Sequence, residues 1–255
     1  MKTRCLVMGL ASASLFAAGA NAAFVVEATG GLASGTNFGF GGDTTAASSS
    51  VPSTAVGLTS SNSLFGGNGS NGAFDAFDPA IADTYVFSYT PGTDADNFSP
   101  AAGTVLGSTD GSPGDGNLAT GLAGGATGRY NVYFTSPAST NVATAGSTIT
   151  ATNDGSDVVL NPVDLNSGGT GPDTQITAPP PGGVIDFVGG ANNAWELIGT
   201  VDLTSGVTYT VTFQANANFF VSQRAHAVMW EAVPEPATVS LLGLGALAML
   251  RRRSA

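Results

Sequence analysis

The chain has almost none of the side chains on which most enzyme chemistry depends. Cys5 is its only cysteine, Lys2 its only lysine and His226 its only histidine. A single cysteine excludes an internal disulfide framework, and one imidazole cannot supply a histidine-based metal site. No serine stands in a Gly-x-Ser-x-Gly elbow, and no lysine is placed to serve a phosphate-binding loop. These absences argue against serine hydrolases of the triad type and against nucleotide-binding loops.

Basic residues are equally scarce between the two ends of the chain. From residue 23 to residue 233 only Arg129 and Arg224 are basic, whereas all of the 18 acidic residues except Glu235 lie in this span. Binding to a phosphate backbone depends on lysine and arginine side chains, so nucleic acid is excluded as a partner. An acidic surface of this kind suits divalent cations or neutral polysaccharide better.

Good helix formers are rare outside the two ends, and glycine is abundant, with 36 residues. Short runs of alternating apolar and polar residues are separated by stretches rich in Gly, Ser, Thr, Asn and Asp. This pattern predicts an all-β fold, a jelly-roll-like β-sandwich with long Gly/Ser/Asp-rich loops. The expected strands are residues 24–28, 84–90, 129–135, 147–152, 157–161, 184–188, 195–203, 207–213 and 224–231.

The first 22 residues have the pattern of a secretory signal peptide with an apolar helix. Lys2 and Arg4 form a positive start, and residues 6–18 are apolar. Ala20 and Ala22 supply the small-x-small pattern of a signal peptidase site. We expect cleavage after Ala22, with cleavage after Ala20 as the alternative. The only cysteine lies in this segment, so the exported chain carries no thiol.

The end of the chain has three parts in a fixed order. The motif Pro234-Glu235-Pro236 comes first, an uncharged run over residues 237–250 follows, and Arg251-Arg252-Arg253 comes last. The prolines keep the motif extended, and the arginines favour the cytoplasmic side of a membrane. A helix over the apolar run would rise only about 21 Å, less than the ~30 Å of a hydrocarbon core. We therefore expect a short transmembrane helix. It is either retained as a tail anchor or recognised as a sorting signal and removed.

This order of parts resembles the PEP-CTERM sorting signal, whose namesake Pro-Glu-Pro stands here at residues 234–236. The resemblance covers residues 234–255 and implies an exported bacterial protein. In that family a membrane-embedded exosortase handles the protein, which is delivered to the cell surface or extracellular matrix. The implied partners are signal peptidase and exosortase as processing enzymes, the membrane before processing, and exopolysaccharide.

Between the two ends, residues 23–233 are expected to form one exported domain, with a loop-rich half over residues 24–127. The better-patterned half, residues 128–231, resembles golvesin C-terminal-like domains, which are β-sandwiches. The likeness lies in four pieces, which are residues 129–134, the turn-rich middle, residues 195–206 and residues 225–228. His226 stands where that family commonly has an acid, so no ligand role is carried over to it.

Two tryptophans and one loop are the candidate ligand-binding features. Trp195 and Trp230 are candidates for stacking on a sugar, but core packing is the favoured role for each. Asp164 and Asn166 match the opening of a calcium loop, but Gln175 stands where that loop needs a bidentate glutamate. Ordinary turn chemistry explains the same two residues. No other cofactor is indicated.

The sequence predicts an exported, non-catalytic protein of the cell surface or extracellular matrix, with a structural or weakly glycan-binding role. The alternative is a secreted polysaccharide-active enzyme that uses loop carboxylates, of which Glu196 and Asp202 are examples. His226 lies on a strand with Val228 and Trp230 and is expected to be packed rather than catalytic.

Overall fold

The computed structural model describes the chain between residues 23 and 233, with gaps. The described residues are 23–41, 47–55, 57–59, 62–66, 84–98, 105–106, 116–117, 127–137, 146–163, 165, 174–175, 186–187, 195–216 and 223–233. They contain strands and no helix, so the predicted all-β fold is confirmed. The expected signal peptide and sorting tail lie outside this part. No helix within the described ranges has the length and apolar character needed to cross a bilayer.

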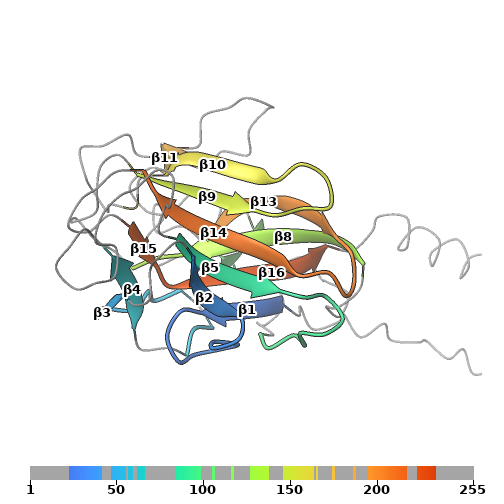
Figure 1. Ribbon diagram of the computed structural model, residues 1–255, viewed down its shortest axis with the longest axis horizontal. Coiled ribbons are helices and arrows are strands. Elements are labelled where there is room, and N and C mark those ends of the chain that lie inside the picture. The colour runs from blue at the N-terminus through green and yellow to red at the C-terminus, as the bar shows by residue number, and fades with distance from the viewer. Residues whose placement is uncertain are drawn as a thin grey trace, which may run out of the picture.

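One sheet has four antiparallel strands in the order β1-β16-β8-β13 (Figure 1). These strands are β1 (Ala23–Glu27), β16 (Ala227–Val233), β8 (Gly128–Thr135) and β13 (Glu196–Leu203). The first strand in the sequence therefore pairs with the last, and β16 lies between β1 and β8. The four-stranded sheet is complete only when both ends of the domain are in place.

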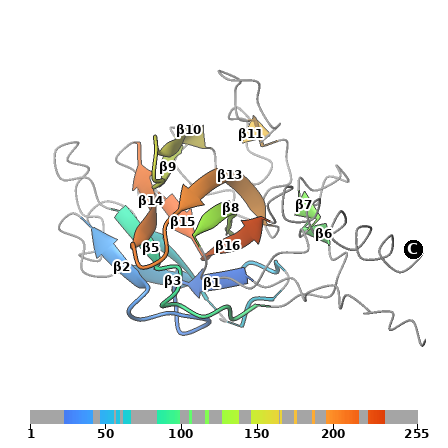
Figure 2. The same ribbon diagram turned by 90° about the vertical axis from the view of Figure 1, so that its right-hand side faces the viewer.

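A second sheet has five antiparallel strands in the order β10-β9-β14-β5-β2. These strands are β10 (Val158–Val163), β9 (Ser147–Ala151), β14 (Tyr209–Ala215), β5 (Thr84–Tyr89) and β2 (Phe38–Gly41). The two sheets pack as the layers of a sandwich, which Figure 2 shows from the end. Strands from the loop-rich half of the sequence enter both sheets, so the two halves form one core.

Three small sheets complete the described strands. The first joins β15 (Gln223–Ala225), β4 (Ser63–Gly66) and β3 (Ser48–Ser50). The second joins β6 (Val105–Leu106) to β7 (Gly116–Asn117). The third is a parallel pair of β11 (Thr174–Gln175) and β12 (Asp186–Phe187).

The core lies between the two large sheets and is rich in aromatic rings. On β5 the residues Tyr85, Phe87 and Tyr89 are buried, and the residues between them are half-buried, as expected for a strand with one face on a core. Phe24 of β1 stacks on Tyr89 with ring centroids 4.9 Å apart, so the N-terminal strand is tied to the opposite sheet.

The outer faces of the two sheets differ. A second apolar cluster covers the four-stranded sheet, where Ala55, Phe98 and Trp195 pack on residues such as Tyr133 and Met229. No described element crosses the outer face of the five-stranded sheet in Figure 1. The half-buried, outward residues of its three central strands are uncharged. They are Thr84, Val86, Ser88, Thr148, Thr150, Thr210, Thr212 and Gln214.

One predicted strand is wrong in an informative way. Residues 224–231 were expected to alternate on a single strand, but the chain leaves β15 after Ala225 and enters β16 at Ala227. His226 donates its backbone N–H to the Thr135 carbonyl at 3.1 Å, although Ala227 is the residue paired with Thr135. The extra residue shifts the alternation, so His226 does not share a face with Val228.

Candidate functional site

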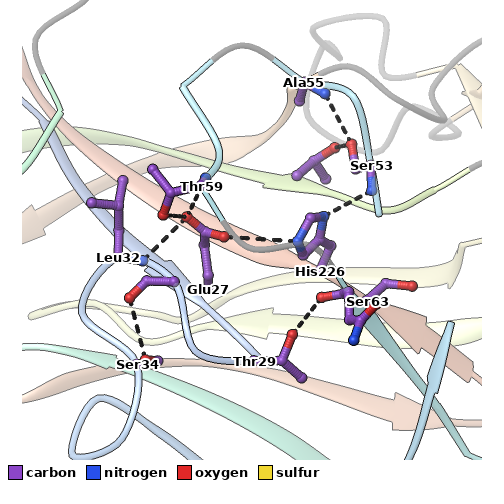
Figure 3. Close-up of polar contacts among 12 residues, drawn as sticks. Glu27, Thr29, Leu32, Ser34, Ser53, Ala55, Thr59, Ser63 and His226 are labelled. Atoms are coloured by element: carbon purple, nitrogen blue, oxygen red, sulfur yellow. Dashed lines mark hydrogen bonds and ion pairs between the residues drawn. The ribbon is translucent and has the colours of Figure 1, made fainter. Parts of the chain in front are cut away.

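A buried polar group is centred on Glu27, the last residue of β1. Its side chain is 0% exposed. One carboxylate oxygen accepts the backbone N–H groups of Leu32, at 3.1 Å, and Thr59, at 2.8 Å, together with the Thr59 hydroxyl at 2.9 Å (Figure 3). A buried carboxylate needs such donors because water no longer solvates it. Glu27 thereby fastens two loops to the edge of the four-stranded sheet.

His226 lies beside Glu27 and is also 0% exposed. Its Nδ1 accepts the backbone N–H of Ser53 at 2.9 Å, so the neutral imidazole carries its proton on Nε2. That Nε2 lies 3.9 Å from the second carboxylate oxygen of Glu27. Burial lowers the pKa of His226 below its usual value, and the nearby Glu27 carboxylate opposes part of that shift.

Ser53 completes the group, which we call the Glu27–His226 cluster, but its hydroxyl does not reach the imidazole. Ser53 Oγ lies 2.6 Å from Thr135 Oγ1 and accepts the N–H of Ala55 at 3.2 Å. A nucleophilic serine needs a hydrogen bond to its base and access to a substrate. Here the base contacts only the serine backbone, and both residues are buried. The geometry of the cluster indicates a structural role, in which its residues hold loops against strands.

The two carboxylates named as an example of a catalytic pair do not form one. Glu196 and Asp202 stand near opposite ends of β13, about 20 Å apart along the strand. Glycosidase pairs are separated by roughly 5 to 10 Å. Glu196 is buried, whereas Asp202 is exposed and forms a surface ion pair with Arg129, with Nε 3.0 Å from Oδ1. Glu196 and Asp202 therefore do not form a catalytic pair of carboxylates.

A second polar group lies at the turn between β13 and β14. Asp154 accepts hydrogen bonds from the Tyr209 hydroxyl and, at 2.8 Å, from the Thr204 hydroxyl. Burial, followed by the hydrogen bond to Asp154, raises the pKa of Tyr209. Its hydroxyl in turn accepts the N–H of Thr204 at 2.8 Å. These bonds fix the turn that connects the two large sheets.

Both tryptophan rings are buried, which agrees with core packing and leaves no room for sugar stacking. Trp195 is 3% exposed and packs in the second cluster, and Trp230 is 2% exposed. The Trp230 ring lies 5.5 Å from that of Tyr89 and 6.4 Å from that of Phe24. Neither ring presents a face to a ligand, and core packing accounts for both.

The calcium candidates Asp164 and Asn166 lie outside the described residues, as do Ala20, Ala22 and the sorting motif. Across the described ranges no three metal-ligating side chains come together. Asp94, another loop carboxylate, accepts the N–H of Thr90 at 2.7 Å and the amide of Asn37 at 3.1 Å. These contacts are ordinary turn chemistry.

The C-terminal tail follows directly from the described domain, since β16 ends at Val233. Residues 232–254 match the model of the PEP-CTERM protein-sorting motif. The tail is a PEP-CTERM motif. The match spans the Pro-Glu-Pro sequence, the apolar run and the arginine cluster. A PEP-CTERM motif implies a protein that is exported, processed by an exosortase and sorted to the cell surface.

The other comparisons add no function. No curated protein matches the chain. The chain is similar to a solved Paenibacillus xanthan lyase at 16% identity and a TM-score of 0.43, over 84% of this chain and 13% of that one. The chain thus spans only a small part of the lyase, and a likeness at this level carries no argument about activity.

The sequence did not indicate that Glu27 would contact His226. Glu27 closes an apolar strand, which is an unusual place for a carboxylate and a usable signal. Its partners, however, come from Leu32, Thr59 and the bulge at His226, and neither loop carries a recognisable pattern. The PEP-CTERM tail, in contrast, is a local sequence and could be identified without any structure.

Proposed function

We propose that this protein is a non-catalytic component of the cell surface or extracellular matrix, cut by an exosortase, with a structural role and weak affinity for glycan. The observation that carries the proposal is the PEP-CTERM match at residues 232–254, which begins in the last two residues of the last strand of a folded β-domain. The sorting motif determines where the protein is delivered, and the β-domain is the part that acts at that location.

The non-catalytic part of the proposal is supported by the described polar groups. The Glu27–His226 cluster is buried, and its serine hydroxyl is bonded to Thr135 rather than to the imidazole. Glu196 and Asp202 are too far apart to act on one glycosidic bond.

The outer face of the five-stranded sheet is the surface that we assign to glycan. Thr212 at its centre pairs with Thr150 on β9, and Thr210 pairs with Ser88 on β5, so hydroxyl groups stand opposite one another on neighbouring strands. Neighbouring strands are about 4.8 Å apart, and outward residues on one strand about 7 Å apart. Such an uncharged array can exchange hydrogen bonds with the hydroxyl groups of a neutral polysaccharide, with weak affinity because no aromatic platform is present.

Intact mass of the surface fraction tests the sorting part. We expect a chain that lacks the arginine cluster, with a new C-terminus near Pro236. A surface-located chain that still ends at Ala255 would contradict processing and leave the tail as an anchor.

Binding to immobilised polysaccharides tests the glycan part. We expect the purified domain to be retained on a neutral polysaccharide and not on a uronate-rich one, because the domain is acidic. Thr212→Glu should reduce retention several-fold, whereas Ser156→Glu, in the exposed turn between β9 and β10, should not. Equal retention of both variants would exclude this face, and release of reducing sugar by the wild-type domain would overturn the non-catalytic assignment.

A further inference from the structure

The two ends of the domain lie at the same end of the four-stranded sheet. β1 and β16 are antiparallel, with Ala23 opposite Glu231, and Val233 follows two residues later on the same strand. The expected signal peptidase site precedes Ala23 in the sequence, and the Pro-Glu-Pro motif follows Val233. Folding therefore brings the two processing junctions close together, although they are at opposite ends of the chain.

The N-terminal junction is enclosed by the fold. Ala23 is 1% exposed, and its N–H donates to the carbonyl of Phe98 at 2.9 Å. Its own carbonyl accepts the N–H groups of Asn97 and Phe98, at 3.0 and 3.1 Å. The Asn97 side chain then binds both the N–H and the carbonyl of Val25, each at 2.8 Å. β1 is thus held by β16 on one side and by residues 97–98 on the other.

The C-terminal junction is open by comparison. Ala232 and Val233 are half-buried, and Val233 pairs with Arg129 of β8 at the end of the ladder. Pro234 comes next and has no N–H to extend that ladder. The pairing of the last strand therefore ends at Val233, before the Pro-Glu-Pro motif.

A protease must hold its substrate as an extended, unpaired segment, so cleavage beside a strand that is paired on both sides requires that strand to open. Ala23 in the folded domain does not meet this condition, whereas Pro234 has no N–H with which to extend the pairing of β16 beyond Val233. The strand that covers β1 also comes last in the sequence. During export β1 therefore lacks its neighbouring strand in the four-stranded sheet until residues 227–233 have crossed the membrane.

We propose that folding sets the order of the two cleavages: signal peptidase cuts before β1 docks, the domain then folds around β16, and exosortase cuts the tail of the folded domain. Each cut is a peptide hydrolysis in which water adds across one amide bond. This order rests on the proposed processing at the PEP-CTERM motif. It makes the complete four-stranded sheet a condition for release, because β16 reaches its place only after the whole domain has been exported.

Pulse-chase labelling of the full chain in a host that has an exosortase tests the order. Three forms are separated by mass: the precursor, the signal-cleaved chain and the chain cut at both ends. Resistance to added proteinase K reports folding. We expect the signal-cleaved form to appear first in a protease-sensitive state, and the doubly cut form to be protease-resistant from its first appearance. A doubly cut form that is at first protease-sensitive would overturn the proposal.

A pair of variants tests the dependence on folding. Val25→Asp places a charge on a buried position of β1, whereas Val159→Asp makes the same change at an exposed position of β10. We expect both chains to lose the signal peptide at the wild-type rate, and the tail cut to be slowed at least five-fold in Val25→Asp alone. An equal rate of tail cleavage in the two variants would contradict the proposed order. Absence of tail cleavage in the wild type would instead contradict the proposed function.

Discussion

Glu27 shows what one buried carboxylate contributes to the fold of a chain with few charged residues. Glu27 is fully buried and accepts three hydrogen bonds from two loops. It stabilises the folded domain because these donors would otherwise have no acceptor. The neighbouring imidazole is held in one tautomer by Ser53. The cluster ties the chain around residues 32, 53 and 59 to the junction of β1 and β16.

Removal of the carboxylate should therefore be costly. Glu27→Ala leaves the N–H groups of Leu32 and Thr59 without their acceptor, and we expect a loss of about 3 kcal/mol in the free energy of unfolding. Urea unfolding followed by tryptophan fluorescence measures it. Asp157→Ala, at an exposed position, is the control and should change stability by less than about 0.5 kcal/mol. Equal effects would mean that Glu27 does not fasten the loops.

Gly31 tests the same cluster from the side of the loop. A methyl group at this position would overlap the Glu27 carboxylate, which is held by three hydrogen bonds and cannot move without breaking them. We expect Gly31→Ala to destabilise the domain by about 1 to 3 kcal/mol. Gly128→Ala is the matched control, since a methyl group there meets open space. Thermal unfolding of the two variants would show a lower Tm for the first alone.

His226 should make stability depend on pH. The pKa of His226 is lower in the folded domain than its ordinary value near 6.5. Below that pH the unfolded chain therefore binds a proton more readily than the folded domain does. Stability attributable to His226 is therefore fully present above about pH 6.5 and is lost as pH falls towards the folded-state pKa. Urea midpoints between pH 7.5 and 5 measure this. His226→Gln should flatten the dependence, and an unchanged slope in that variant would assign it to other groups.

At the scale of elements, alternation predicted most of the strands in the large sheets. Tyr85, Phe87 and Tyr89 on β5, and the turn before β14 with Gly206 at φ +83°, match the expectation from the sequence. Local pattern was sufficient there because each strand has one buried face. It failed at His226, where a bulge shifts the alternation, since the extra residue is fixed by contacts with Thr135 and Ser53.

The candidate site was less predictable than the fold. Whether a tryptophan ring packs or binds depends on what lies opposite it, and Trp230 meets Phe24 and Tyr89 from distant strands. Pairing of β1 with β16 likewise joins the two ends of the domain, and no local pattern specifies it. The PEP-CTERM motif could be identified because its meaning is carried by the sequence itself.

Trp230 links the elements of both sheets and should be sensitive to truncation. Because its ring is buried between β1 and β5, we expect Trp230→Ala to cost about 3 to 5 kcal/mol in the free energy of unfolding. Val159→Ala, on the exposed side of β10, should be close to neutral. Chemical unfolding of the two variants gives the comparison, and a small effect at Trp230 would contradict its place in the core.

At the scale of the whole molecule, the N-terminal strand is part of the central structure. β1 is buried along its length and is bonded to β16, which is bonded to β8. An end strand in such a position cannot fray without exposing the core. Removal of β1 would therefore leave one backbone edge of β16 unpaired and take Phe24 away from Tyr89 and Trp230.

Hydrogen exchange tests whether β1 opens together with β16 and β8. We expect the amides of β1 that pair with β16 to exchange through the same global opening as those between β16 and β8, with equal free energies. The amides of the edge strand β2, which pairs with β5 alone, should exchange faster through local opening. Early exchange in β1 would show that the strand detaches independently.

The enclosure of Ala23 also affects the chemical reactivity of the mature surface. Lys2 is the only lysine, so a chain cleaved after Ala22 has a single primary amine, the α-amino group of Ala23. In the full chain that nitrogen is a peptide N–H that donates to the Phe98 carbonyl. The folded domain would then offer one amine, at the start of β1, to aldehydes, to amine-directed labels or to isopeptide formation. Any other attachment to surrounding polymers would depend on hydroxyl, amide and carboxyl groups.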